Sequence, residues 1–214
     1  MRKTKTFICT IPFQRNKDAL KSVVYKPSGN SKLEYGKTRF PIIPVINGYA
    51  ERNDKIRVIA IISEGESFKH NYDAYFVPEI NELVEKNGYE FAGIEIINTP
   101  DSEDIETQLE LFVDLIGMIS DDEEISACIT YGTKPTPIVQ FIALNYASKL
   151  KSNATIGCVA YGRFLHTDEF GTLYDQTALF YMDSIVNKLA EAKVARPETA
   201  IRALLGIGGE EDAE

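Results

Sequence analysis

The sequence predicts an α/β protein of the Rossmann-like kind, with a largely parallel open sheet and helices on both faces. Short apolar runs of strand length alternate along the chain with longer segments whose apolar residues recur at helical spacing. This alternation is typical of parallel strands joined by crossover helices. The chain has 214 residues and a hydrophobic content of 44%, which is enough to fill the core of one such domain.

The expected strands are runs rich in aliphatic and β-branched residues. They lie at 6–11, 55–62, 91–97, 125–131 and 154–160. Residues 12–32 are polar, basic and turn-rich, so we expect a long functional loop there. Residues 32–46 have a strand-like composition, but Pro41 and Pro44 favour an edge strand or a bent one. The polar segment 165–175 is expected to be a loop or a small hairpin.

The expected helices lie between and after these strands. They cover 71–87, 102–119, 138–150, 176–192 and 199–205. The strongest pattern is in 102–119, where apolar residues recur at helical spacing and acidic residues fill the first turn. Pro78 is an irregularity in the first of these helices, and Gly88 suits its C-terminal cap.

We expect a single Rossmann-like domain over residues 1–195, followed over 196–214 by a short helix and an acidic disordered tail. Cys9, Cys128 and Cys158 fall inside strand-like runs without metal-ligand spacing, which predicts buried structural thiols. No apolar run approaches the roughly 18–20 residues of a membrane span. The basic N-terminus is not followed by a secretory apolar segment, so we expect a cytoplasmic protein.

The formal net charge of −9 argues against non-specific binding of duplex DNA. The charge is nevertheless unevenly distributed. Residues 1–57 hold 13 Lys and Arg against 4 Asp and Glu, whereas residues 58–214 hold 10 against 28. This asymmetry is typical either of a polyanion site in an acidic fold or of a solvated basic loop.

Residues 125–138, ISACITYGTKPTPI, are the most informative stretch of the chain. An apolar run stops at Gly132, Thr133 and Lys134 follow, and two prolines then open a helical pattern. The first N–H groups of a helix have no partner within it, and the helix dipole adds partial positive charge there. Because open α/β sheets bind ligands at the carboxyl ends of their strands, the stretch predicts an anion site.

Three loops at expected strand ends carry residues suited to binding a ligand. They are Ile11, Pro12, Phe13, Gln14 and Arg15; Tyr131, Gly132, Thr133, Lys134, Pro135 and Thr136; and Tyr161, Gly162, Arg163 and Phe164. The set supplies glycines that expose the backbone, three cations, hydroxyl groups and aromatic rings that can stack on bases. Phosphate-binding and base-stacking groups on one edge of the sheet favour a nucleotide-like ligand.

Several common catalytic and cofactor motifs are absent from the sequence. GxGxxG, GxxxxGK[ST], GxSxG and HExxH do not occur. His70 and His166 have no partner at metal-ligand spacing, so each is expected to be a surface or loop histidine. We therefore expect neither a metal ion nor a cofactor.

Three short motifs follow one another along the chain: YGTKPTP at 131–137, VAYG at 159–162 and LYDQTAL at 173–179. Their order resembles the CARF domains of type III CRISPR systems, which are Rossmann-like sensors of cyclic oligoadenylates. The chain looks closest to a stand-alone member of the subgroup with a long loop after strand one. The resemblance covers about residues 5–192, and its pattern implies that Asp175 caps the helix that follows.

This resemblance implies a homodimer that binds cyclic oligoadenylate, with cyclic tetra-adenylate as first choice, in a two-fold pocket. Lys134 would stabilise charge, Arg15 and Arg163 would neutralise phosphates, and Thr133 or Thr10 would orient the ribose 2′-OH. We expect metal-independent cleavage of the ring by a ring nuclease of antiviral defence. The alternatives are a non-catalytic sensor or sponge that acts through a separate effector protein, and a generic nucleotide-binding α/β protein. Neither a membrane nor duplex DNA is an expected partner.

Overall fold

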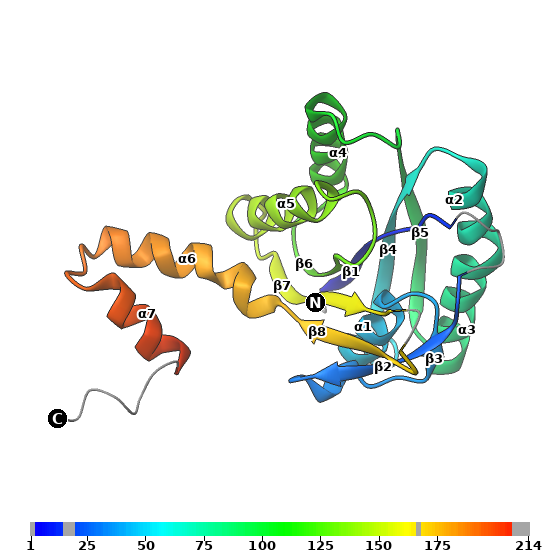
Figure 1. The fold of residues 1–214 in the computed structure, drawn as a ribbon, viewed down its shortest axis with the longest axis horizontal. Coiled ribbons are helices and arrows are strands. Elements are labelled where there is room, and N and C mark those ends of the chain that lie inside the picture. Colours follow the sequence, from blue (N-terminus) through cyan, green and yellow to red (C-terminus); the bar gives the residue numbers. More distant parts are fainter. Residues whose placement is uncertain (1–2, 15–19, 166–167, 207–214) are drawn as a thin grey trace. The chain divides into compact units, whose positions relative to one another are not determined.

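The computed structural model describes residues 3–14, 20–165 and 168–206 (Figure 1). Within these residues, no helix combines the length and the apolarity that crossing a membrane requires. The same residues contain no cluster of His, Cys, Asp and Glu side chains that could hold a metal ion.

The chain divides into two compact units, Met1–Thr177 and Ala178–Glu214. The first unit holds the sheet, whereas the second holds α7 (Pro197–Leu205) and all but the first residue of α6 (Thr177–Glu191). Both helices were expected from the sequence. The expected domain boundary between residues 195 and 196 falls between them, inside the second unit.

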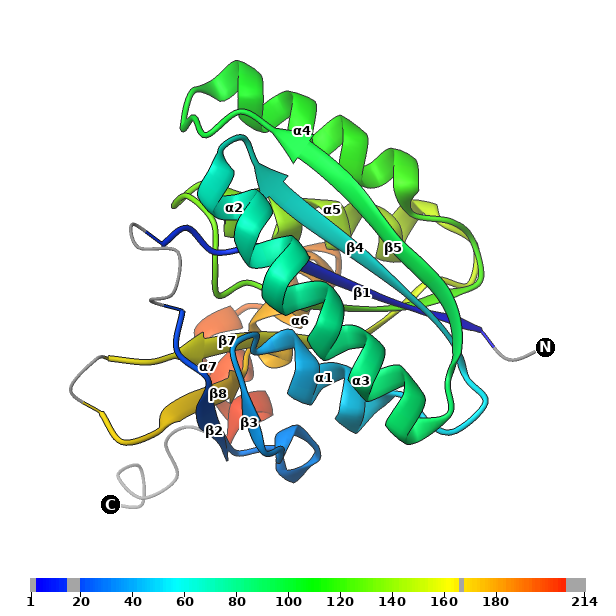
Figure 2. The same cartoon turned by 90° about the vertical axis from the view of Figure 1, so that its right-hand side faces the viewer.

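One sheet of eight strands organises the first unit (Figures 1 and 2). The strands are β1 (Thr4–Thr10), β2 (Val23–Ser28), β3 (Lys37–Thr38), β4 (Lys55–Ser63), β5 (Glu90–Thr99), β6 (Glu123–Cys128), β7 (Thr155–Arg163) and β8 (Gly171–Asp175). Their order across the sheet is β3-β2-β8-β7-β6-β1-β4-β5. The five strands from β7 to β5 are parallel, β2 is parallel to β8, and the β2–β3 and β7–β8 pairs are antiparallel. The predicted α/β fold with a largely parallel open sheet is confirmed.

Helices cover both faces of this sheet (Figures 1 and 2). One face carries α1 (Ile42–Tyr49), α2 (Glu66–Asn71), the π-helical turn η2 (Tyr72–Phe76) and α3 (Val77–Asn87), and the other carries α4 (Ile105–Met118) and α5 (Thr136–Leu150). Successive residues of a strand point to opposite faces. In β1, Phe7 and Cys9 belong to the core shared with α1 and α3, whereas Ile8 points the other way and is also fully buried. Apolar side chains on both faces of the central strands explain why these runs are continuous in the sequence.

The start of α4 confirms the strongest helix prediction. Asp104 caps the helix by accepting hydrogen bonds from the N–H and the hydroxyl of Thr107, both at 2.9 Å, and from the hydroxyl of Ser102. These bonds, the one from Ser102 first, lower the pKa of Asp104 to about 2. The capping carboxylate therefore stays ionised throughout the neutral and mildly acidic range.

The helix expected at 71–87 is present but begins earlier, at Glu66. The irregularity expected at Pro78 takes the form of the wider turn η2, which lies directly before the helix that contains this proline. Gly88 ends α3 with a φ of +68°, and its N–H donates to the Val84 carbonyl at 2.9 Å. The expected C-terminal cap is confirmed.

Two expectations for residues 12–46 are wrong. The expected loop contains β2 and the 3-10 turn η1 (Ser31–Leu33), and the expected strand over 32–46 is replaced by the short β3 followed by α1. β2 was missed because its main partner is β8, which no local pattern reveals. Pro27 is tolerated because β2 is paired on one side only at that residue. Pro41 and Pro44 occupy the N-cap and the first turn of α1, where a helix accepts proline.

The ends of the strands near residues 125–138 also differ from expectation. β6 stops at Cys128 rather than at residue 131, whereas β7 continues through Arg163 because β8 pairs with it. The antiparallel pairing of β8 with β7 agrees with the hairpin alternative. Asp175 ends β8, one residue before the N-cap position of the helix that begins at Thr177, and its carboxylate accepts a hydrogen bond from the Thr177 N–H at 2.9 Å.

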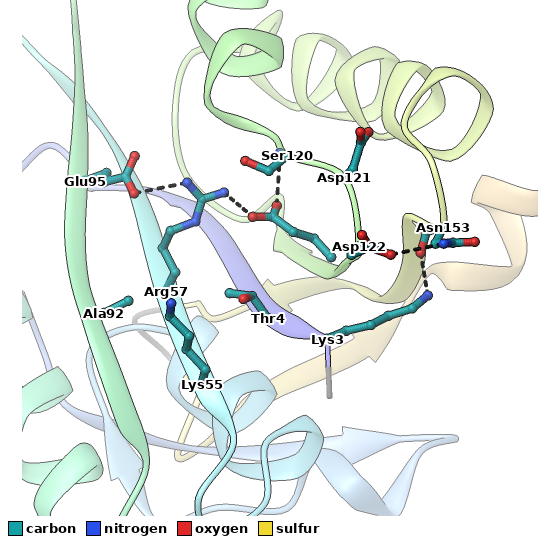
Figure 3. A pocket seen from close by; sticks show the side chains of 11 residues that line it. Lys3, Thr4, Lys55, Arg57, Ala92, Glu95, Ser120, Asp121, Asp122 and Asn153 are labelled. Carbon is teal, nitrogen blue, oxygen red and sulfur yellow. Dashed lines mark hydrogen bonds and ion pairs between the residues drawn. The ribbon is translucent and has the colours of Figure 1, made fainter. Parts of the chain in front are cut away.

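At the amino edge of the sheet, charged side chains line a cavity of about 800 Å³ (Figure 3). Arg57 of β4 lies at its centre and donates to Glu123 at 2.7 Å, to Glu95 at 3.0 Å and to the Met118 carbonyl at 2.9 Å. The side chains of Arg57 and Glu123 are only 12% and 5% exposed. The Arg57 side chain thus joins β4 to its neighbour β5, to β6 on the far side of β1, and to the end of α4.

The three cysteines are buried and form no disulfide, as the sequence predicted. Burial raises the pKa of the Cys128 thiol to about 11 and that of Cys158 to about 12, and it also raises the pKa of Cys9. The thiols remain protonated at neutral pH, so none of them is suited to act as a nucleophile.

Candidate functional site

The order in which successive strands are added to the sheet reverses at β1, so the point between β1 and β6 is a topological switch point. β4 and β5 lie on one side of β1, whereas β6 and β7 lie on the other. In open α/β sheets, the crevice beyond the carboxyl ends of two such strands is where ligands bind. Here those ends are Thr10 and Cys128, and the predicted anion site follows Cys128 directly along the chain.

The turn after β6 is held closed by its own residues. Gly132 has a φ of +110°, and a Cβ at this position would lie 2.8 Å from the Cβ of Thr136. The hydroxyl groups of Thr133 and Thr136 share a hydrogen bond of 3.0 Å. Lys134 lies between these threonines in the sequence and is exposed. The turn therefore presents a cation to solvent at the start of α5.

The first turn of α5 offers fewer N–H donors than the sequence suggested. Its two prolines have none, Thr136 donates to the Thr133 carbonyl at 3.1 Å, and Ile138 donates to the Pro135 carbonyl at 2.9 Å. An anion at this end of α5 would be held by the Lys134 ammonium group and the helix dipole, because the helix N–H groups are used or missing.

Thr10 and Ile11 are buried, so their side chains are not placed to contact a ligand. Thr10 is 2% exposed, and its hydroxyl accepts a hydrogen bond from the amide of Gln140 in α5 at 2.9 Å. Ile11 is fully buried, and its N–H donates to the Ile61 carbonyl at 2.9 Å. Both residues hold β1 against its neighbours, and neither lines the cavity described below.

The loop after β1 is anchored on α2. The amide of Asn71 donates to the Pro12 carbonyl at 2.9 Å, and the N–H of Gln14 donates to the Ser67 hydroxyl at 3.2 Å. Phe13 is 54% exposed, with its ring 5.5 Å from that of Phe68. The predicted ligand residue Arg15 lies outside the described residues. The described part of the loop therefore exposes one aromatic side chain beside the switch between β1 and β6.

A cavity of about 340 Å³ lies at this edge of the sheet, towards β7 and β2. It is lined by Gln14, Leu20, Lys21, Tyr25, Thr130, Tyr131, Tyr161, Gly162, Arg163, Phe164 and Leu165. These described lining residues include two cations and four aromatic rings but no carboxylate and no histidine. The lining is therefore suited to an anionic ligand with flat aromatic groups.

The cavity brings together part of the predicted site. The predicted residues that line it are Gln14, Tyr131, Tyr161, Gly162, Arg163 and Phe164. The predicted residues Pro12, Phe13, Gly132, Thr133, Lys134, Pro135 and Thr136 lie on the adjoining loop and turn instead. Gly162 and Arg163 belong to β7 itself and not to a loop after it, because β8 extends the ladder.

Lys21 and Tyr25 were missed as site residues. They come from the segment that was expected to be one long loop, and β2 holds Tyr25 in the wall of the cavity. The excess of positive charge in residues 1–57 was the sequence signal for this region. That signal was compatible with a polyanion site or with a solvated basic loop, and it could not say which cations line a cavity.

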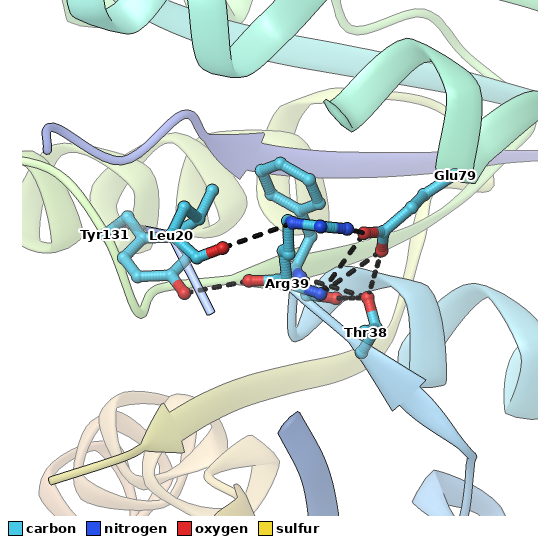
Figure 4. A network of polar contacts seen from close by, with 6 residues as sticks. Leu20, Thr38, Arg39, Glu79 and Tyr131 are labelled. Atoms are coloured by element: carbon cyan, nitrogen blue, oxygen red, sulfur yellow. Dashed lines mark hydrogen bonds and ion pairs between the residues drawn. The ribbon is translucent and has the colours of Figure 1, made fainter. Parts of the chain in front are cut away.

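Arg39 joins the walls of the cavity (Figure 4). Its backbone carbonyl accepts a hydrogen bond from the Tyr131 hydroxyl at 2.9 Å, and its side chain donates to the Leu20 carbonyl at 3.2 Å. The guanidinium group also forms an ion pair of 3.0 Å with Glu79 of α3 and lies 4.3 Å from the centre of the Tyr75 ring. One residue thus fixes two lining segments to the helix beneath them, which positions the cavity wall.

The phenol of Tyr131 is a neutral donor in this wall. Burial first, and then the neighbouring Tyr25 with which it shares a hydrogen bond, raise the pKa of Tyr131 well above its ordinary value. Burial likewise raises the pKa of Tyr25. Both phenols therefore remain protonated at physiological pH, so neither of them can act as a general base.

Gly162 is required by close packing, and we expect Gly162→Ala to lower the free energy of unfolding by about 1–3 kcal/mol. An added Cβ would lie 2.7 Å from the Cγ of Pro41 and 3.2 Å from the hydroxyl of Thr130, which accepts the Gly162 N–H at 2.8 Å. The proline ring cannot rotate away. Urea unfolding measures the change, and Gly36→Ala, with open space around the new methyl group, is the matched control. Equal stability of the two variants would contradict the packing argument.

No protein-family model matches the chain, and a search of curated proteins finds no matching relative.

Proposed function

We propose that the chain binds a cyclic oligoadenylate, cyclic tetra-adenylate first, as a homodimer, and cleaves the ring without a metal ion. By the motif resemblance, this activity is that of a ring nuclease in type III CRISPR antiviral defence. The observation that carries the proposal is the cavity of about 340 Å³, whose described lining has two cations and four aromatic rings and no carboxylate. Phosphates and adenine rings are the groups that such a lining recognises.

The size of the cavity limits how much of a cyclic oligoadenylate one protomer can enclose. Small-molecule sites usually measure about 300–1,000 Å³, so this cavity takes one nucleotide rather than a ring of four. The rest of the ring would lie over the exposed Lys134 turn and reach a second copy. A cyclic tetramer matches this arrangement, because a two-fold dimer presents the same contacts twice.

Cleavage needs orientation and charge stabilisation more than it needs an ionising side chain. The ribose 2′-oxygen attacks the adjacent phosphorus in line, the bond to the 5′-oxygen breaks, and the proton lost by the 2′-OH is balanced by one gained at the 5′-oxygen. The products are a 2′,3′-cyclic phosphate and a 5′-OH. Lys134 would stabilise charge on the phosphate, and Thr133 would orient the ribose. Thr10 is less suited to that role because it is buried.

A second candidate function is binding without cleavage, as a sensor or sponge that works through a separate effector protein. It is favoured by the described cavity lining, which contains no histidine or carboxylate to transfer a proton. The same residues would hold the ligand in both functions. The fate of the ligand is what separates them.

The experiment incubates the purified protein with cyclic tetra-adenylate and cyclic hexa-adenylate in EDTA. A thermal shift measures binding, and chromatography resolves the products. Binding with linear products ending in a 2′,3′-cyclic phosphate is the expected result. Binding with intact ligand would establish the second candidate function. A failure to bind either ring would overturn the proposal and leave a nucleotide site of another kind.

A further inference from the structure

The outer face of α4 and α5 is apolar although it is exposed. In α4, Ile105, Leu109 and Val113 are 73%, 57% and 60% exposed, and their spacing of four residues places them in one row. In α5, Ile138 and Ile142 are 61% and 51% exposed. The α4 row borders a groove of about 590 Å³. Exposed apolar surfaces of this kind mark sites of association.

The two helices join their apolar rows into one surface, here called the α4–α5 face. They lie side by side on the same side of the sheet (Figures 1 and 2). The rings of Phe112 and Tyr146 meet edge to face between them, with centroids 6.4 Å apart. By helical geometry, both rings lie on the sides that the two helices turn towards each other, next to the exposed aliphatic rows.

The two halves of the face carry opposite charge. Residues 101–124, which include α4, hold ten Asp and Glu and no Lys or Arg. Three of these, Glu106, Glu110 and Asp114, each follow a residue of the apolar row and line the same groove. Residues 125–165, which include α5, hold no Asp or Glu. Of their four cations, Lys149 lies in α5, Lys134 and Lys151 flank that helix, and Arg163 lies in β7, away from this face.

We infer that the α4–α5 face is where two copies of this chain associate, with α4 of each copy packed on α5 of the other. The inference rests on the homodimer of the proposed function and names its surface. A two-fold interface brings each patch against its counterpart, so the carboxylates of α4 twice meet a helix that has no carboxylate and carries Lys149 in its last turn. Pairing α4 with α4 would instead oppose two rows of carboxylates.

This arrangement fixes the direction of the two-fold axis. α4 and α5 both begin near the carboxyl edge of the sheet, because each follows a strand of the parallel set. Only an axis that runs along the helices can place α4 opposite α5, and such an axis keeps the helix directions parallel. Both Lys134 turns then lie at the same end of the dimer. Ile138 begins the apolar row of α5 one turn after Lys134, so the interface adjoins the candidate site.

The first test measures sedimentation of the protein without ligand, over a range of micromolar concentrations. The wild-type chain is expected to sediment as a dimer of 24.0 kDa subunits, and Leu109→Asp as a monomer. Leu109 is more than half exposed, so the aspartate does not enter the core, and circular dichroism checks that the variant is folded. Glu82→Lys with Glu85→Lys, on the exposed side of α3, is the control and should remain dimeric.

The second test asks whether α4 meets α5. One variant replaces Glu106, Glu110 and Asp114 with lysine, and the other replaces Lys149 and Lys151 with glutamate. Each variant alone is expected to be monomeric, because the reversed row then faces like charge. An equimolar mixture is expected to form heterodimers, because both of its α4–α5 pairings become complementary.

The outcomes separate this inference from the proposed function. A monomeric wild-type chain, or a Leu109→Asp variant that stays dimeric, would overturn the α4–α5 face as the interface. So would two reversed variants that dimerise alone. Neither measurement uses ligand, so a dimer that behaves as expected and yet binds no cyclic oligoadenylate would refute the proposed function and leave the interface standing.

Discussion

Replacing Arg57 with methionine is expected to lower the free energy of unfolding by about 3–5 kcal/mol. Arg57 is the common partner of Glu123 and Glu95 at the amino edge of the sheet, and Glu123 is almost fully buried. Methionine fills much of the same volume but leaves the Glu123 carboxylate buried without its cation. The loss of stability arises from that unpaired charge, and it is larger than the free energy that the ion pair contributes to folding. Urea unfolding at neutral pH measures the change.

The two carboxylates that contact Arg57 provide the controls. Glu95 is 45% exposed, so Glu95→Gln is expected to change stability by less than about 1 kcal/mol. The double variant Arg57→Met with Glu123→Gln removes the buried charge and should recover part of the loss. If Glu95→Gln destabilises the protein as much as Arg57→Met does, burial of Glu123 is not the cause.

Lys134→Ala is expected to weaken binding of cyclic tetra-adenylate by at least about a hundredfold. Loss of a hydrogen bond to a charged group costs about 1.5–3 kcal/mol, or about tenfold or more in affinity. In a two-fold dimer every substitution acts twice on one ligand, so the two losses multiply. If the lysine acts mainly on charge that develops during cleavage, the single-turnover rate falls more than the affinity does.

Two further lysine variants test whether the loss of affinity depends on the positive charge at position 134. Lys134→Arg keeps the charge and should retain most of the affinity. Lys86→Ala removes an exposed lysine near the end of α3, at the opposite edge of the sheet, and should leave affinity unchanged. Titration of the ligand at two salt concentrations checks the electrostatic origin, because loss of a phosphate contact lowers the salt dependence of binding. Unchanged binding by Lys134→Ala would remove this residue from the site.

The parallel core of the fold could be predicted because its signals are local. β1, β4, β5, β6 and β7 each contain a run rich in apolar residues, and α4 has both a strong periodicity and a capping residue in Asp104. The region between β1 and β4 could not be predicted in the same way. β2 depends on β8 for its partner, and α1 begins at prolines that local rules associate with a bent strand.

The sequence predicted those parts of the candidate site that lie at the ends of the parallel strands. The turn at Lys134 and the wall at Tyr161 and Arg163 were located by motif position. Lys21 and Tyr25 were not, because their place in the wall depends on the pairing of β2. Burial also separates residues that look equivalent in the sequence. Thr10 ends β1 and Thr133 lies in the turn after β6, yet the Thr10 hydroxyl accepts a hydrogen bond from Gln140 within the core.

The pairing of β2 with β8 has a consequence for the order in which the protein acquires its site. During synthesis the segment that contains Tyr25 emerges early, but its partner, Gly171–Asp175, emerges only after all the other strands have been made. Contacts so distant in sequence form late, because a long loop must be closed first. The central sheet can therefore assemble while the wall formed by Lys21 and Tyr25 is still incomplete. A nascent chain would gain its fold before it gains the ability to hold a ligand.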